Sequence, residues 1–270
     1  NGTDTDNDVA DFRAGPVSLG VSNDSAVPPP QPVEPLLIGE FVYDGQKPST
    51  EGDEFVEICN PNTYEVPLPG YKIGDEEARG GGESMYNLPA ESLQPNDCLV
   101  IAKNKADFLN AYAAPAKLYE VGQLTKYTAW GSGSWSLAND GDELVLLGPD
   151  DQVMDSVAYR NGDYAGLGLE AGASAPEPYS LQRVWPFDTN SMLQDFVKTK
   201  PNPGQLTPLP PPPAEPPAPA VLSNGMFAYW GDLHAHTSYS DGAGPPFYAL
   251  AMARAAGLHF FSLTVHGWWL

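Results

Sequence analysis

A proline-rich segment places the strongest constraint on how this chain folds. Residues 208 to 219, PLPPPPAEPPAP, contain eight prolines in twelve positions. Proline fixes φ and lacks a backbone donor, so such a run prefers extended polyproline II and cannot join a packed core. We therefore expect a semi-rigid linker at 208–220, between one domain at 36–207 and a second at 221–270.

Short apolar runs separated by turn residues fill the stretch from 36 to 207. Strand patterns occur in LLIGEFVYDG, DEFVEICNPN, VPLPGYKIGD, DCLVIAK and SLQRVW, and KADFLNAY indicates one short helix. GDELVLLGPDDQVMDSVAYRNG indicates a hairpin, because two apolar runs flank a turn at 148–151. Strands at this spacing predict a mainly β chain that folds as an antiparallel sandwich or barrel.

The alternation of side chains along a strand indicates which residues form the core. Val56 and Ile58 share one face of the strand DEFVEICN. The opposite face carries Phe55, Glu57 and Cys59. Further core candidates come from the predicted hairpin, and they are Leu144, Leu146, Val153 and Val157.

The two cysteines, Cys59 and Cys98, have two interpretations. Two cysteines are too few for a disulfide scaffold, and each lies beside apolar strand residues. The simpler interpretation is a pair of small buried thiols. A single bridge is the alternative, because the sequence does not give their separation in space.

Acidic turns and loop tryptophans also leave alternatives open. The turns at 140–142 and 150–151 resemble calcium loops in composition, but they lack the oxygen-ligand spacing of an EF-hand. Ordinary Asp and Gly turn chemistry is therefore the favoured interpretation. Trp130 and Trp135 lie in a Gly/Ser loop, where they form either a contact surface or part of the sandwich edge.

The net charge of −22 bears on possible partners. Nucleic-acid affinity comes largely from Lys and Arg, and the chain has 13 such residues without a cluster. We therefore expect no direct binding of nucleic acid. We also expect no membrane span, since no apolar run approaches the ~20 residues that cross a bilayer.

The ordered strand segments from about 37 to 206 resemble bacterial lamin-tail domains. The resemblance rests on the series IGEFVYDG, DEFVEICNPNTYEVPLPGYKIGDEE, DCLVIAKN, WSLANDGDELVLLGPDDQVMDSVAYRNG and SLQRVWPFDTN. It implies an immunoglobulin-like β-sandwich without catalytic residues. Such domains accompany secreted bacterial hydrolases as accessory or binding modules, so the resemblance implies an extracellular or cell-surface location and a surface or protein ligand.

The first 35 residues are expected to be mostly unstructured, because they are rich in Asp and end in prolines. They contain an echo of the end of the sandwich. Asp and Thr at 4–5 precede Asp and Phe at 11–12, and the same pairs recur at 188–189 and 195–196. Either the echo is coincidental, or residues 1 to about 27 are the tail of an upstream sandwich copy.

Residues 221–270 read as a strand, a helix and a second strand, which is typical of a parallel α/β domain. One such unit cannot bury its apolar faces, so we expect a truncated domain. All four histidines lie in the last 37 residues of the chain. His234 and His236 are two apart at the end of an apolar strand, so both imidazoles can reach one metal ion, and Asp241 could add an oxygen ligand.

The string GDLHAHTSYSDG, with SLTVH downstream, resembles the polymerase and histidinol phosphatase family. That family forms a distorted β/α barrel whose cluster of two or three metal ions hydrolyses phosphate esters. The resemblance implies that His234, His236, Asp241 and His266 are metal ligands for Mn, Zn or Fe. Val265 departs from the family, which has Asp at this position. His259 is interpreted as structural.

The sequence thus predicts a fragment of a secreted, metal-dependent phosphoesterase with an accessory lamin-tail module. This chain alone is expected to have an incomplete catalytic site and to bind metal weakly. The alternative is a non-catalytic binding protein in which the sandwich is the functional unit.

Overall fold

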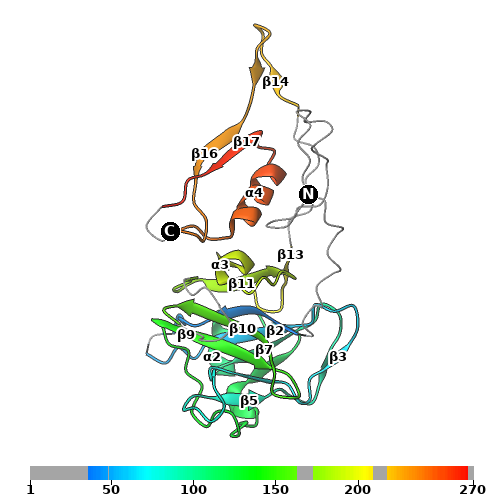
Figure 1. The fold of residues 1–270 in the computed structure, drawn as a ribbon, viewed down its shortest axis with the longest axis vertical. Coiled ribbons are helices and arrows are strands. Elements are labelled where there is room, and N and C mark those ends of the chain that lie inside the picture. The colour runs from blue at the N-terminus through cyan, green and yellow to red at the C-terminus, as the bar shows by residue number, and fades with distance from the viewer. Residues whose placement is uncertain (1–35, 48, 163–172, 209–217, 267–270) are drawn as a thin grey trace, which may run out of the picture. The chain divides into compact units, whose positions relative to one another are not determined.

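The computed structural model describes residues 36–47, 49–162, 173–208 and 218–266. Strands predominate over helices in these ranges (Figure 1). Among the described residues, no helix combines the length and the apolar character needed to cross a bilayer.

The larger sheet of the sandwich is mostly antiparallel. β1 pairs antiparallel with β2, with a register shift between Ile38 and Glu40, and β2 pairs antiparallel with β7 without a shift. Among the described strands, β8 and β13 join the sheet in parallel. Across the sheet the order is β12 (Phe196–Thr199), β11 (Ser180–Trp185), β1 (Leu37–Val42), β2 (Phe55–Cys59), β7 (Cys98–Ala102) and β8 (Leu118–Glu120), with β13 (Thr207–Pro208) beside β11.

The smaller sheet contains the predicted hairpin, whose two strands pair antiparallel around the expected turn. Its order is β10 (Val153–Arg160), β9 (Gly141–Leu147), β4 (Lys72–Gly74) and β5 (Met85–Asn87). The remaining elements of the sandwich are β3 (Val66–Pro67), β6 (Ser92–Leu93), α2 (Lys105–Ala111), η1 (Val121–Gln123) and α3 (Met192–Asp195).

The main core contains side chains from both sheets, which confirms the sandwich prediction. Val56 and Ile58 lie in this core, as the alternation predicts. Leu144, Leu146 and Val157 lie there too. Val153 does not, because a register shift between Val153 and Asp155 turns it to the outer face of the smaller sheet.

The outer face of the larger sheet is also covered. α2 begins at its N-cap Asn104, whose side chain accepts the backbone N–H of Asp107. The helix buries Phe108, whose ring meets that of Phe55 edge to face, with centroids 5.4 Å apart. Because both faces are covered, every residue of β1 and β2 is buried.

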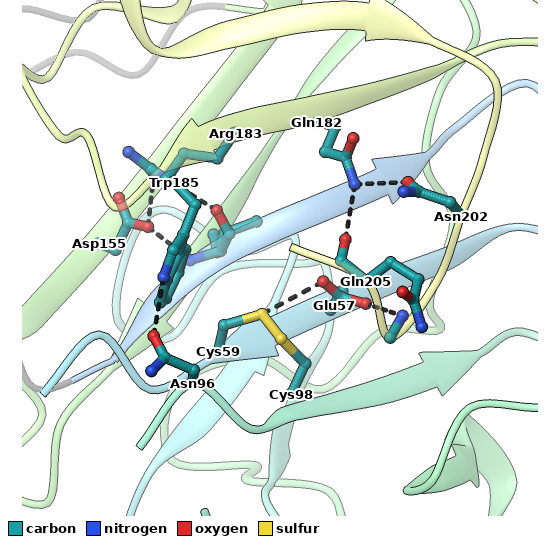
Figure 2. The surroundings of a disulfide bond; sticks show 12 residues. Glu57, Cys59, Asn96, Cys98, Asp155, Gln182, Arg183, Trp185, Asn202 and Gln205 are labelled. Carbon is teal, nitrogen blue, oxygen red and sulfur yellow. Dashed lines mark hydrogen bonds and ion pairs between the residues drawn. A yellow bond between two sulfur atoms is a disulfide. The ribbon is translucent and has the colours of Figure 1, made fainter. Parts of the chain in front are cut away.

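Cys59 and Cys98 form a disulfide, so the interpretation of two separate thiols is wrong (Figure 2). They lie directly opposite each other on β2 and β7, a register that the sequence did not reveal. Trp185 packs against the bridge. Gly39 is required beside it, because a Cβ at that position would lie 2.7 Å from Cys59 Sγ.

Residues 218–266 form a hairpin and a strand–helix–strand unit. The hairpin pairs β14 (Ala220–Val221) with β15 (Phe227–Ala228). β16 (Gly231–Ala235) and β17 (Phe260–Leu263) pair in parallel, and α4 (Pro246–Ala255) connects them. The helix has Pro at its first turn and is followed by Gly257 at φ 79°, both as the sequence indicates. That this unit opens a barrel stays a prediction.

Two predicted segments lie outside the described residues. They are the N-terminal 1–35, with the first copy of the echo, and most of the proline linker, at 209–217. The second copy of the echo is described. There Thr189 donates its backbone N–H and its hydroxyl to Asp195, both at 2.8 Å. Phe196 lies beneath the guanidinium of Arg183, 4.7 Å from the ring centroid.

Candidate metal centre

Three histidines converge at the carboxyl ends of two paired strands. His234 lies on β16, His236 directly follows that strand, and His266 lies shortly after β17. β16 and β17 are parallel, so their carboxyl ends meet at one edge. The ring centroids of His234 and His236 are 4.8 Å apart, and those of His236 and His266 are 4.5 Å apart.

Asp241 comes to the same point from the loop after β16. Its Oδ1 lies 2.5 Å from His236 Nδ1, and its Oδ2 lies 3.7 Å from His266 Nε2. The hydrogen bond with His236, aided by the charge of both imidazoles, holds the pKa of the Asp241 carboxyl below its usual range. The carboxylate is therefore ionised at neutral pH and available as a hard oxygen donor.

The turn that carries Asp241 folds back on the residues that directly follow β16. Ser240 and Gly242 both donate their backbone N–H groups to the carbonyl of Thr237, each at 2.9 Å, and Thr237 is fully buried. A Cβ at Gly242 would lie 2.4 Å from the backbone of His236. Only glycine permits this approach, so Gly242 places Asp241 beside the imidazoles.

One ring nitrogen in this group is buried without a partner. His236 Nε2 has no hydrogen-bond partner among the described residues, although its other nitrogen contacts Asp241. Ligand atoms of His236, Asp241 and His266 all lie within 4.8 Å of one another. A buried nitrogen lone pair that lacks a donor is unfavourable, and a cation bound at Nε2 would satisfy it.

His234 lies beside this group but outside the three-residue set. Its Nδ1 is 3.1 Å from the Thr264 hydroxyl, and its backbone N–H bonds Asp232 Oδ1 at 2.9 Å. Thr264 has no role in the sequence prediction, and only its position two residues before His266 could have indicated one. Val265, between them, supplies no ligand atom.

His259 lies apart from the cluster. Its Nδ1 accepts the backbone N–H of Trp230 at 3.0 Å, and its own N–H donates to the Trp230 carbonyl at 2.7 Å. These bonds extend the pairing of β16 and β17, which agrees with a structural role.

The sandwich contains a separate cluster of three glutamates, which lines a cavity of about 450 Å³. Ligand atoms of Glu77, Glu83 and Glu143 lie within 4.8 Å of one another. Burial and the neighbouring carboxylates raise the pKa of Glu83 to about 7, and the same two causes raise that of Glu143. Partly protonated carboxyls can lie together without a cation, so this group is not assigned as a metal site.

The acidic turns and the tryptophans of the sandwich have structural roles. Asp142 accepts the backbone N–H of Ala138 at 2.9 Å, and Asp151 Oδ1 lies 2.6 Å from Lys72 Nζ. These contacts agree with turn chemistry. Trp135 is buried in the main core, while Trp130 packs on the outer face of the smaller sheet and bonds the Glu76 carbonyl at 2.9 Å.

With this geometry in place, the sandwich can be compared with known proteins. Residues 29–161 match the family model of the Lamin Tail Domain. β11 and β12 lie beyond the match, yet β11 pairs with β1, so the folded sandwich is longer than the matched segment.

Two further comparisons add little to that match. A solved structure of a DUF4876 family protein from Bacteroides thetaiotaomicron VPI-5482 is similar over 64% of this chain and 74% of that chain, with 15% sequence identity and a TM-score of 0.46. No curated protein gives a significant match.

Proposed function

We propose that the unit after the lamin tail domain binds a divalent metal ion through His234, His236, Asp241 and His266. The observation that carries the proposal is the buried, unpartnered Nε2 of His236, which lies next to an ionised carboxylate and a second imidazole. Mixed imidazole and carboxylate donors suit Zn, Mn and Fe ions.

The reaction class that we propose for this site is hydrolysis of phosphate esters. A metal ion supplies an activated water and neutralises phosphate oxygens when it is bound in such a site. The resemblance of GDLHAHTSYSDG to the polymerase and histidinol phosphatase family supports this class. Because Val265 supplies no carboxylate, we expect these residues alone to hold the ion weakly and to catalyse poorly.

The lamin tail domain is proposed to act as an accessory binding module that places the hydrolase on a surface or substrate. The formed disulfide and the net charge of −22 support an extracellular or cell-surface location. A second candidate is a protein whose lamin tail domain alone is functional, since the family match covers only that part of the chain.

Isothermal titration with Mn²⁺ or Zn²⁺ tests the metal site. The wild-type chain is expected to bind the metal ion at one class of site. A His234→Ala, His236→Ala double variant is expected to lose this binding. His259→Asn is the matched control, because it removes an imidazole from the same unit but leaves the cluster intact. Indistinguishable isotherms for the wild type and the double variant would refute the site and favour the second candidate.

Inorganic phosphate is the probe for the reaction class. We expect phosphate to bind the wild-type chain only after loading with Mn²⁺, and not to bind the double variant. Metal binding without any metal-dependent phosphate binding would refute the phosphoesterase assignment alone.

A further inference from the structure

Thr264 occupies a position from which it can control one histidine of the proposed site. It directly follows β17, and its backbone N–H donates to the carbonyl of Ala235 at 2.8 Å, so it is fixed against the end of β16. Its hydroxyl Oγ1 lies 3.1 Å from His234 Nδ1 and 3.4 Å from the same Ala235 carbonyl oxygen. One hydroxyl thus contacts both the His234 side chain and the Ala235 carbonyl of β16.

The hydrogen-bonding capacity of these groups limits the arrangement. A hydroxyl has one proton to donate and lone pairs to accept, whereas a carbonyl oxygen can only accept. If the Thr264 hydroxyl donates to Ala235, it can contact His234 Nδ1 only by accepting an N–H from it. A neutral imidazole carries one N–H, so Nε2 of His234 is then left with a free lone pair.

Asp241 imposes the same arrangement on the neighbouring ring. An ionised carboxylate can only accept, so the 2.5 Å contact requires the proton to lie on His236 Nδ1. Nε2 of His236 then has a free lone pair as well, and that nitrogen is the buried one without a partner. A hydroxyl directly after β17 and a carboxylate in the loop after β16 therefore prepare two rings in the same tautomer.

We propose that Thr264 is a positioning residue that holds His234 in the Nδ1–H tautomer, with Nε2 ready to bind a metal ion. The tautomer of His234 does not depend on a bound metal ion. Only its consequence, the effect on metal binding, rests on the proposed function. A hydrogen-bond partner on the second ring nitrogen orients a histidine ligand, and its loss typically weakens metal affinity by about 10- to 100-fold.

Nitrogen-15 NMR of the imidazoles at alkaline pH, without metal, tests the inference. The wild-type chain is expected to show His234 mainly as the Nδ1–H form. Thr264→Val keeps the shape but removes the hydroxyl, so the ring should revert to a mixture of tautomers. Thr264→Ser should restore the wild-type spectrum. An unchanged His259 signal in all three proteins shows that the unit remains folded.

The result that would overturn the inference is a His234 ring that is Nε2–H in the wild type, or one that Thr264→Val leaves unaltered. A Mn²⁺ titration of the same proteins separates this failure from that of the proposed function. We expect Thr264→Val to weaken Mn²⁺ binding by about tenfold or more, with rescue by Ser. A wild-type chain with the Nδ1–H tautomer and no Mn²⁺ binding would refute the metal site but leave the role of Thr264 intact.

Discussion

Arg183 and Asp155 form an ion pair that joins the two sheets of the sandwich. Arg183 Nη2 on β11 lies 2.8 Å from Asp155 Oδ2 on β10, and both side chains are almost fully buried. Asp155 Oδ2 also accepts the backbone N–H of Ile38 at 2.7 Å, while Arg183 Nε donates to the Ile38 carbonyl at 2.8 Å. The pair is therefore bonded to β1 as well, at the centre of the larger sheet.

Arg183→Met should strongly destabilise the sandwich. The change leaves the buried Asp155 carboxylate without its cation, and removing one partner of a buried pair costs about 3–5 kcal/mol. Urea unfolding measures the loss. Arg79→Met is the matched control, because Arg79 is exposed and pairs with Asp151 at the surface, where a salt bridge contributes about 0–1 kcal/mol. Equal midpoints for the two variants would contradict the importance of the buried pair.

A buried carboxyl beneath the chain after β12 should make stability depend on pH. Glu57 is 1% exposed, and burial raises its pKa to about 8, with a contribution from the nearby Glu40. Since the folded-state pKa is raised, the folded state binds the proton more tightly. The associated stability is fully present below the unfolded value of 4.5 and is lost as pH rises through about 8.

Glu57→Gln should therefore flatten the pH profile of stability. The amide can still accept the backbone N–H of Gly204, which bonds the Glu57 carboxylate, but it does not ionise. The difference between variant and wild type is expected to grow by on the order of 2 to 4 kcal/mol in favour of Gln between pH 4 and pH 9. Chemical unfolding at a series of pH values measures it, and parallel profiles would exclude the effect.

The disulfide should add stability that a reductant removes. Cys59 and Cys98 are separated by 39 positions. Closing a loop of that length lowers the entropy of the unfolded chain, which stabilises the fold by about 4 kcal/mol in the simplest account. We expect the urea midpoint to fall when the bridge is reduced, and a Cys59→Ala, Cys98→Ala double variant to match the reduced wild type. A midpoint insensitive to reductant would show that the bridge does not stabilise the sandwich.

Local patterns account for the parts of the fold that the sequence predicts. The alternation in β2 predicts its core face, and the turn residues predict the β9–β10 hairpin. Both signals lie within one or two neighbouring strands. The side-by-side placement of His234 and His236 is equally local, because it needs only the two-residue period of a strand.

What the sequence could not predict depends on register and on contacts between distant segments. The shift after Val153 turns that residue outward, and no local pattern shows it. Glu57 is covered by the chain around Gly204, and no local pattern shows that this distant segment lies over it. Arg183 reads as one more strand residue, because its partner Asp155 comes 28 positions earlier. The disulfide and the contact between Thr264 and His234 could not be predicted for the same reason, because each joins residues that are far apart in the sequence.

A crystal structure of the chain grown with Zn²⁺, with anomalous scattering recorded at the zinc edge, tests the central claim most directly. The account predicts an anomalous peak about 2.1 Å from His236 Nε2, with His234, Asp241 and His266 as further ligands. A peak confined to the carboxyls of Glu77, Glu83 and Glu143, or no peak at any histidine in a crystal saturated with zinc, would contradict it.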